Sequence, residues 1–68
     1  MGVRDVLATN LRRLRQQNGL SQEELAHLAH VDRTYVSSLE RAVYGATVDT
    51  VDRLAQSLNV EAWELLKP

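Results

Sequence analysis

The sequence predicts a small all-α domain, and three observations support this fold class. Apolar residues recur three and four positions apart along almost the whole chain, which is the period of a helix. Residues suited to starting a helix stand before three of the apolar stretches. No stretch alternates apolar and polar residues as a half-buried strand does. With 68 residues and 44% hydrophobic content, the chain is expected to fold as a single domain over residues 1–68.

The first expected helix occupies the N-terminal part of the chain. Its apolar stripe consists of Val3, Leu7, Leu11 and Leu14. Gly19 follows the last turn and is expected to end the helix in the left-handed conformation that glycine adopts without strain.

Two short helices are expected next, with a break of a few residues between them. Ser21 and Glu24 form a capping box, in which each side chain bonds the backbone of the other residue. Asp32 is suited to cap the following helix. The positions expected to face the core are Leu25, Ala26, Ala29, Val36 and Leu39. The positions expected on the outside of the later helix are Arg33, Thr34, Ser37 and Ser38, with Tyr35 at the edge.

The C-terminal part of the sequence predicts a loop over residues 42–46 and two more helices. Thr47 can cap the fourth helix, and Asn59 can take the left-handed exit from it. The apolar stripe of the fourth helix is Val48, Val51, Leu54, Ala55 and Leu58. The short fifth helix is marked by Val60, Ala62, Leu65 and Leu66.

Composition excludes several classes of protein. The chain has no Cys, and its two His have no evident carboxylate partner, so neither a metal site nor another cofactor is expected. No apolar run reaches membrane-spanning length and no signal peptide is evident, so we expect a cytoplasmic protein without a membrane partner. No nucleophile–base pair or phosphate loop is visible, so no enzyme is expected. Net charge is −1, and the basic residues concentrate within residues 1–20.

The stretch from Gln22 to Arg41 resembles the helix-turn-helix of the Cro/repressor-type family, also called XRE-like. The matching pattern is Gln22, Ala26, His30-Val31-Asp32, Val36, Leu39 and Glu40-Arg41. The likeness continues into both flanks, and Asp32-Arg33-Thr34-Tyr35-Val36-Ser37 is also similar to controller proteins of restriction–modification systems. The resemblance implies a compact five-helix, repressor-like DNA-binding domain whose second and third helices form the helix-turn-helix. It also implies binding of double-stranded DNA as a homodimer.

The resemblance implies that the third helix enters the major groove, which is wide enough to admit it. Arg33 is then expected to contact a guanine or a phosphate, and Gln22 a phosphate at the start of the second helix. The alternative for Arg33 and Gln22 is a solvated surface side chain without a contact to DNA. Tyr35 can either contact a phosphate or serve as a half-buried structural residue. The residues expected to bind DNA are Ser21, Gln22, Arg33, Thr34, Tyr35, Ser37, Ser38 and Arg41.

Three further expectations concern structure. The family usually has Gly where this chain has His30, so His30 is expected at positive φ, where His is one of the enriched non-glycine residues. Arg15 and Glu40 resemble a family ion pair that links the first and third helices. Trp63 and Leu66 in the last helix are expected as dimer contacts, with a place in the core as the alternative for Trp63.

The favoured function is therefore a sequence-specific transcriptional regulator that binds a two-fold related operator. One alternative keeps the fold but makes the chain an antitoxin-like or other protein-interaction module, with a toxin as a possible partner. The weak net charge and the apolar loop over residues 42–46 favour this alternative, because relatives often carry basic residues in that loop. The other alternative is a helical interaction domain without affinity for DNA.

Overall fold

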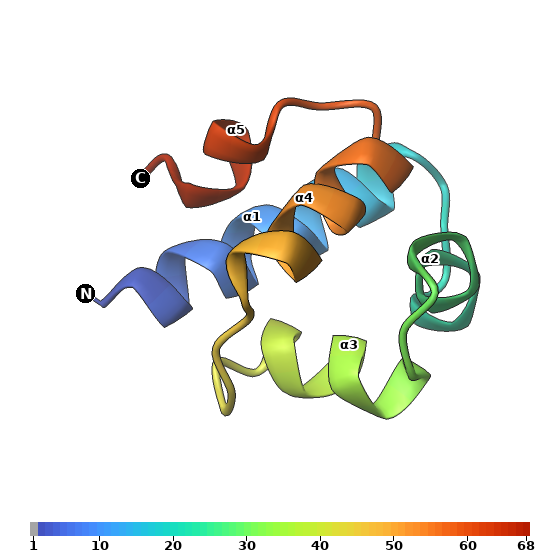
Figure 1. The fold of residues 1–68 in the computed structure, drawn as a ribbon, viewed down its shortest axis with the longest axis horizontal. Helices are drawn as coiled ribbons and strands as arrows, with labels where there is room; N and C mark the ends of the chain where they lie inside the picture. Colours follow the sequence, from blue (N-terminus) through green and yellow to red (C-terminus); the bar gives the residue numbers. More distant parts are fainter. Residues whose placement is uncertain (1) are drawn as a thin grey trace.

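The computed structural model describes residues 2–68, which fold into five helices and, within that range, no strand. The helices are α1 (Val3–Gln17), α2 (Gln22–Ala29), α3 (Arg33–Glu40), α4 (Val48–Ser57) and α5 (Ala62–Leu66) (Figure 1). The expected all-α class and the number of helices are confirmed. None of the helices in the described part of the chain combines the length and apolarity needed to cross a bilayer.

One hydrophobic core joins all five helices. α1 packs against α3 on one side and α5 on another, while α2 packs against α3 and α4. α4 and α5 also contact each other, so the chain closes on its first helix, and both ends lie on the same side of the molecule (Figure 1). The largest fully buried side chains are Leu11, Leu25, Leu39, Leu54, Leu58, Leu65 and Val36.

Helix starts follow the local signals in the sequence. Ser21 Oγ accepts from the Glu24 amide at 3.0 Å, and the Glu24 carboxylate accepts from the Ser21 amide at 2.8 Å. The bonds from the Ser21 backbone and side chain lower the pKa of Glu24, so the box stabilises the fold above the ordinary glutamate pKa. That contribution is lost as the pH falls through the lowered value. Asp32 and Thr47 cap α3 and α4, as expected, by accepting from the amides of Thr34 and Thr50.

The first four helices end in the same way, with a Schellman motif. In each, one residue has positive φ, and the amide of the next residue donates to the carbonyl five positions earlier. Gly19, His30 and Asn59 adopt this conformation, with φ of 68°, 58° and 59°, and all three were expected. Ala42, with φ 59°, was not expected. Its conformation lets the Val43 amide donate to the Ser38 carbonyl at 3.0 Å and folds the loop back on α3.

The first residue of the expected apolar stripe lies outside the core in both α1 and α4. Val3 is 66% exposed and Val48 is 86% exposed, because each lies in the first turn of its helix, where no other helix covers it. Conversely, Asn10 is buried, and its amide donates to the carbonyls of Leu65 and Lys67 at 3.0 and 2.8 Å. Asn10 thus satisfies the C-terminal end of α5, which no local sequence signal indicates.

Ala42→Gly is expected to raise the free energy of unfolding by about 0.5–1 kcal/mol. Left-handed backbone strains an L-residue, and the relief of this strain outweighs the added freedom that glycine gives the unfolded chain. Denaturant titration with circular dichroism would measure the change. Gly19→Ala is the matched control, since an added Cβ meets no atom within 4 Å there and only strain remains. It should lower stability, and a loss of stability in Ala42→Gly would contradict the left-handed assignment.

Candidate nucleic-acid interface

α3 lies at an edge of the molecule, and its N-terminal half has one face open to solvent (Figure 1). Arg33 and Thr34 are exposed at its N-terminal end, and Ser37 is half-buried one turn later. Val36, Leu39 and Glu40 form the opposite, buried face. α3 therefore offers a short polar surface with a cation at one end, while its other face fixes it to the core.

Ser38 corrects an expectation from the sequence. It was expected on the outside of α3, but it is only 4% exposed. The loop that follows α3 turns back toward the helix at this residue, where the Val43 amide donates to the Ser38 carbonyl at 3.0 Å. The Ser38 side chain is therefore not available at the surface, and contact with DNA is not expected of it.

Tyr35 joins α3 to the same loop. Its hydroxyl donates to the Gly45 carbonyl at 3.3 Å, and its ring packs against the hydrophobic core. Its half-buried ring suits a structural role, and its accessible hydroxyl suits a phosphate contact. The next residue beyond the helix, Arg41, is exposed.

The ion pair between Arg15 and Glu40 is present and holds α3 to α1. Arg15 donates through Nε and an Nη to the two carboxylate oxygens, at 2.6 and 3.0 Å. A further Nη donates to the Leu20 carbonyl at 2.8 Å, so the same guanidinium also holds the entry to α2. The bonds with Glu40 raise the pKa of Arg15 despite the opposing effect of its partial burial. Glu40 itself is 3% exposed.

Gln22 and Arg12 complete this arrangement. The Gln22 amide donates to a Glu40 carboxylate oxygen at 3.1 Å, which links α2 to α3. Arg12 donates to the Glu40 backbone carbonyl at 2.7 Å and caps the end of α3. Sequence patterns gave no sign of this role for Arg12, because the bond spans 28 positions along the chain.

The charges around α3 are mixed. Arg33 and Arg41 flank the exposed face, and Ser21 and Gln22 stand at the start of α2, where backbone amides point outward. Glu23 and Glu24 share that first turn, so the site is not uniformly basic. Within residues 2–68, no group of His, Asp and Glu is arranged to hold a metal ion.

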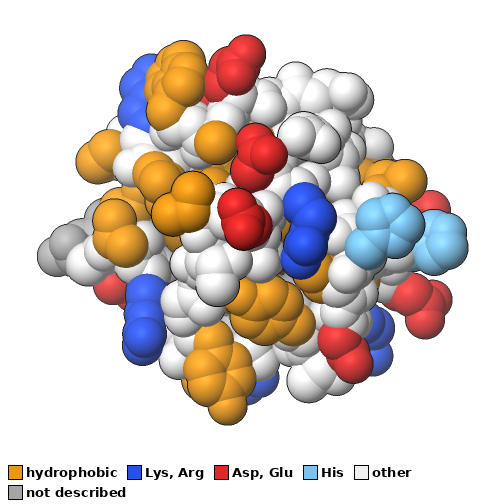
Figure 2. Space-filling view, in the orientation of Figure 1, with side chains coloured by type: hydrophobic (Ala, Val, Ile, Leu, Met, Phe, Trp, Pro, Cys, Tyr) orange, Lys and Arg blue, Asp and Glu red, His pale blue; other side chains and the backbone are white. Residues whose placement is uncertain are grey.

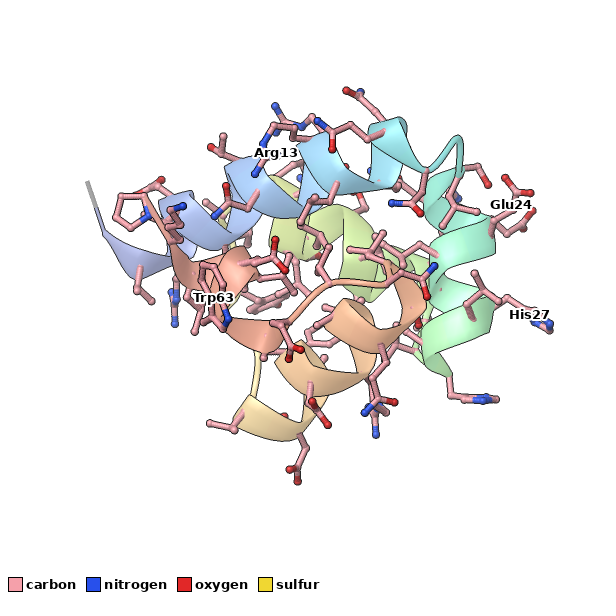
Figure 3. All side chains as sticks on the ribbon, turned by 90° about the horizontal axis from the view of Figure 1, so that it is seen from above. Arg13, Glu24, His27 and Trp63 are labelled. Carbon is pink, nitrogen blue, oxygen red and sulfur yellow. The ribbon has the colours of Figure 1, made fainter. Side chains whose placement is uncertain are left out.

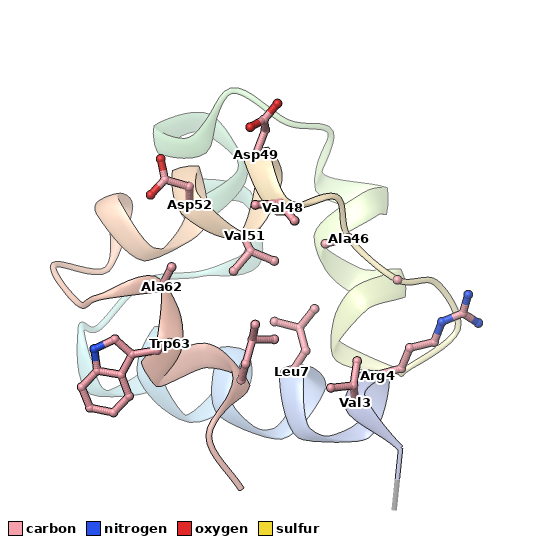
Figure 4. A pocket seen from close by; sticks show the side chains of 12 residues that line it. Val3, Arg4, Leu7, Ala46, Val48, Asp49, Val51, Asp52, Ala62 and Trp63 are labelled. Atoms are coloured by element: carbon pink, nitrogen blue, oxygen red, sulfur yellow. The ribbon is translucent and has the colours of Figure 1, made fainter.

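An apolar groove, about 630 Å³ in volume, lies on another side of the molecule, between the start of α1, the start of α4 and α5. Its hydrophobic lining consists of Val3, Leu7, Ala46, Val48, Val51, Ala62, Trp63 and Leu66 (Figure 4). Figure 2 shows hydrophobic side chains gathered on the side that carries the two chain ends. Figure 3 shows that Trp63 lies far from Glu24 and His27 of α2. Trp63 is 60% exposed, so it is not a core residue.

The fold and the α2–turn–α3 site define a helix-turn-helix protein. Residues 11–64 match the model of the helix-turn-helix family, and the chain belongs to this family. It is 44% identical over 66 residues to a hypothetical transcription factor of Neisseria meningitidis serogroup B, covering 97% of this chain and 62% of the relative. A solved Neisseria transcription factor, NHTF, has 43% identity and a TM-score of 0.95, covering 98% of this chain and 77% of that one.

Two controller proteins are also similar. Control protein C.SmaI of Serratia marcescens is 41% identical over 66 residues, covering 97% of this chain and 79% of the relative. The restriction–modification controller C.Esp1396I, solved as a tetramer in complex with its 35 base-pair operator, has 26% identity and a TM-score of 0.86. The alignment with C.Esp1396I covers 97% of this chain and 91% of the controller. The Neisseria relative is named as a transcription factor, and the Serratia relative is named as a control protein.

Glu40→Ala is expected to lower the free energy of unfolding by roughly 3–5 kcal/mol, because it leaves the partly buried Arg15 without its anion. Thermal unfolding followed by circular dichroism would measure this. Glu23→Ala is the control: it removes an exposed glutamate that bonds no other helix within residues 2–68, and should change little. An unchanged midpoint of thermal unfolding in Glu40→Ala would show that the ion pair does not stabilise the fold.

Proposed function

We propose that this chain is a sequence-specific DNA-binding transcriptional regulator, without enzymatic activity, that acts in the cytoplasm as a homodimer on a two-fold related operator. The observation that carries the proposal is the outward polar face of α3, held in place by the buried Glu40 at its other face. A recognition helix must keep a fixed orientation to select bases, and α3 is fixed through both α1 and α2.

In this proposal α3 lies in the major groove and Arg33 makes a bidentate contact with guanine. Thr34 and Ser37 contact base edges or phosphates beside it. Gln22 contacts a phosphate with the second amide hydrogen that its bond to Glu40 leaves free. The start of α2 at Ser21 favours the same phosphate, since backbone amides there attract anions.

A second copy of the chain is the proposed occupant of the apolar groove. Val48, Val3 and Trp63 are 86%, 66% and 60% exposed, which is unfavourable for a monomer that leaves them in water. A domain this small gains stability from association. The controller C.Esp1396I, a structural neighbour, assembles on its operator as a tetramer, which is consistent with association of this chain.

The alternative is an antitoxin-like module whose groove holds a different protein. Two features favour it: the groove itself and the loop over residues 42–46, which has no charged residue. A chain that stays monomeric yet binds a toxin through Trp63 and Leu66 would fit this alternative. The oligomeric state therefore separates the two.

Arg33→Ala is expected to weaken operator binding by roughly 1–3 kcal/mol and to relax preference at one base pair in each half-site. The operator would first be obtained by selection from a random duplex pool, and affinity measured by fluorescence anisotropy. Arg53→Ala, on the exposed side of α4, is the matched loss of charge and should leave both properties unchanged.

Equal weakening on operator and random DNA would instead make Arg33 a phosphate contact, with a lower salt dependence. If Arg33→Ala changes neither affinity nor preference, α3 is not the reading element.

Sedimentation at micromolar concentration is expected to give twice the 7.7 kDa mass of one chain. Trp63→Ala and Leu66→Ala should each shift the equilibrium toward the monomer, because they remove apolar surface from the groove. Leu28→Ala is the control, since Leu28 is 50% exposed on α2 but outside the groove. A wild-type chain that sediments as a monomer under these conditions would contradict the dimer.

A further inference from the structure

Arg4 lies beside the loop that follows α3, although it comes from the start of α1. A Cβ placed on Gly45 would lie 3.2 Å from Arg4 Nε, so this close approach depends on the missing side chain at Gly45. Figure 4 shows the Arg4 side chain extending past this loop. Arg4 is exposed, and within residues 2–68 no carboxylate pairs with it.

The loop connects Arg4 to α3. The Gly45 carbonyl accepts a hydrogen bond from the Tyr35 hydroxyl of α3 at 3.3 Å. Arg4 lies beside Gly45, so this glycine connects Arg4 with α3. The loop itself supplies no charge between Arg41 and Asp49. Arg4 therefore provides the positive charge that the sequence of this loop lacks.

Arg4 is also one of the residues that line the apolar groove, where it lies beside Val3 at one edge (Figure 4). It thus stands where the groove meets the side of the molecule that carries α3 (Figure 4). If the proposed dimer forms through the groove, this edge of each protomer would come toward the symmetry axis, with Arg4 on the side that carries α3.

When two recognition helices occupy successive major grooves on one face of a duplex, the minor groove between them faces the protein. Its two phosphate backbones attract a cation held at the axis. We infer that Arg4 of each protomer contacts the phosphates that flank the central minor groove of the operator. This inference rests on the proposed function.

Arg4→Gln tests the inference, with Arg53→Gln as the control of equal charge change. Affinity for the selected operator would be measured across a series of salt concentrations. The slope of log affinity against log salt should fall by about two per dimer in Arg4→Gln, since each lost phosphate contact contributes about 0.9. Arg53→Gln should keep the wild-type slope, and Arg4→Lys should keep most of it because the charge remains.

Hydroxyl-radical footprinting gives a second measurement. Protection at the centre of the operator should be lost in Arg4→Gln while protection in the two half-sites remains. Sedimentation of the same variant should give the wild-type dimer, which separates a DNA contact from a dimer contact. A wild-type slope and footprint in Arg4→Gln would overturn the inference, and so would a weakened dimer with an unchanged slope.

Failure of the proposed function is distinguishable from failure of the inference. If the wild-type chain selects no sequence and shows no salt-dependent binding, the proposed function fails. If the wild-type chain binds its operator and Arg4→Gln binds it equally well, only the role of Arg4 fails.

Discussion

The buried carboxylate of Glu40 is the interaction on which the placement of α3 depends. Burying a charge is costly unless it is fully paired, and here Arg15 of α1 and Gln22 of α2 provide the partners. Arg12 holds the backbone carbonyl of the same residue. The three helices therefore meet at one residue, and a shift of α3 would leave a charge unpaired in the interior. Hydrophobic burial alone is non-directional, whereas the bonds to Glu40 require donors at fixed positions.

The bonds that hold Glu40 explain how a helix of eight residues can present a defined surface. A helix this short is not stable by itself in water. Its caps, its buried face and its end are all held by other parts of the chain, so its outward residues need not contribute to stability. Arg33, Thr34 and Ser37 are thereby free to serve recognition.

The groove and the α3 face share an edge, so the proposed assembly and the proposed DNA binding would be connected through it. The loop over residues 42–46 runs along that edge and is tied to α3 through Tyr35 and Gly45. An association through the groove would thus fix the distance between two α3 helices without any flexible connection. The apolar character of the loop, which suggested a protein-interaction module in the sequence, is compatible with this role.

The sequence itself determined where these helices begin and which residues share an apolar face, because caps and apolar spacing act over a few residues. Ser21, Asp32 and Thr47 begin their helices as the sequence predicts, and His30 and Asn59 end theirs as expected. Tertiary structure decided the rest. It buried Ser38, left Val3, Val48 and Trp63 in solvent, and gave Asn10 and Arg12 partners far along the chain. Periodicity tells which residues share a helix face, but burial depends on what packs against that face, and this is a property of the whole fold.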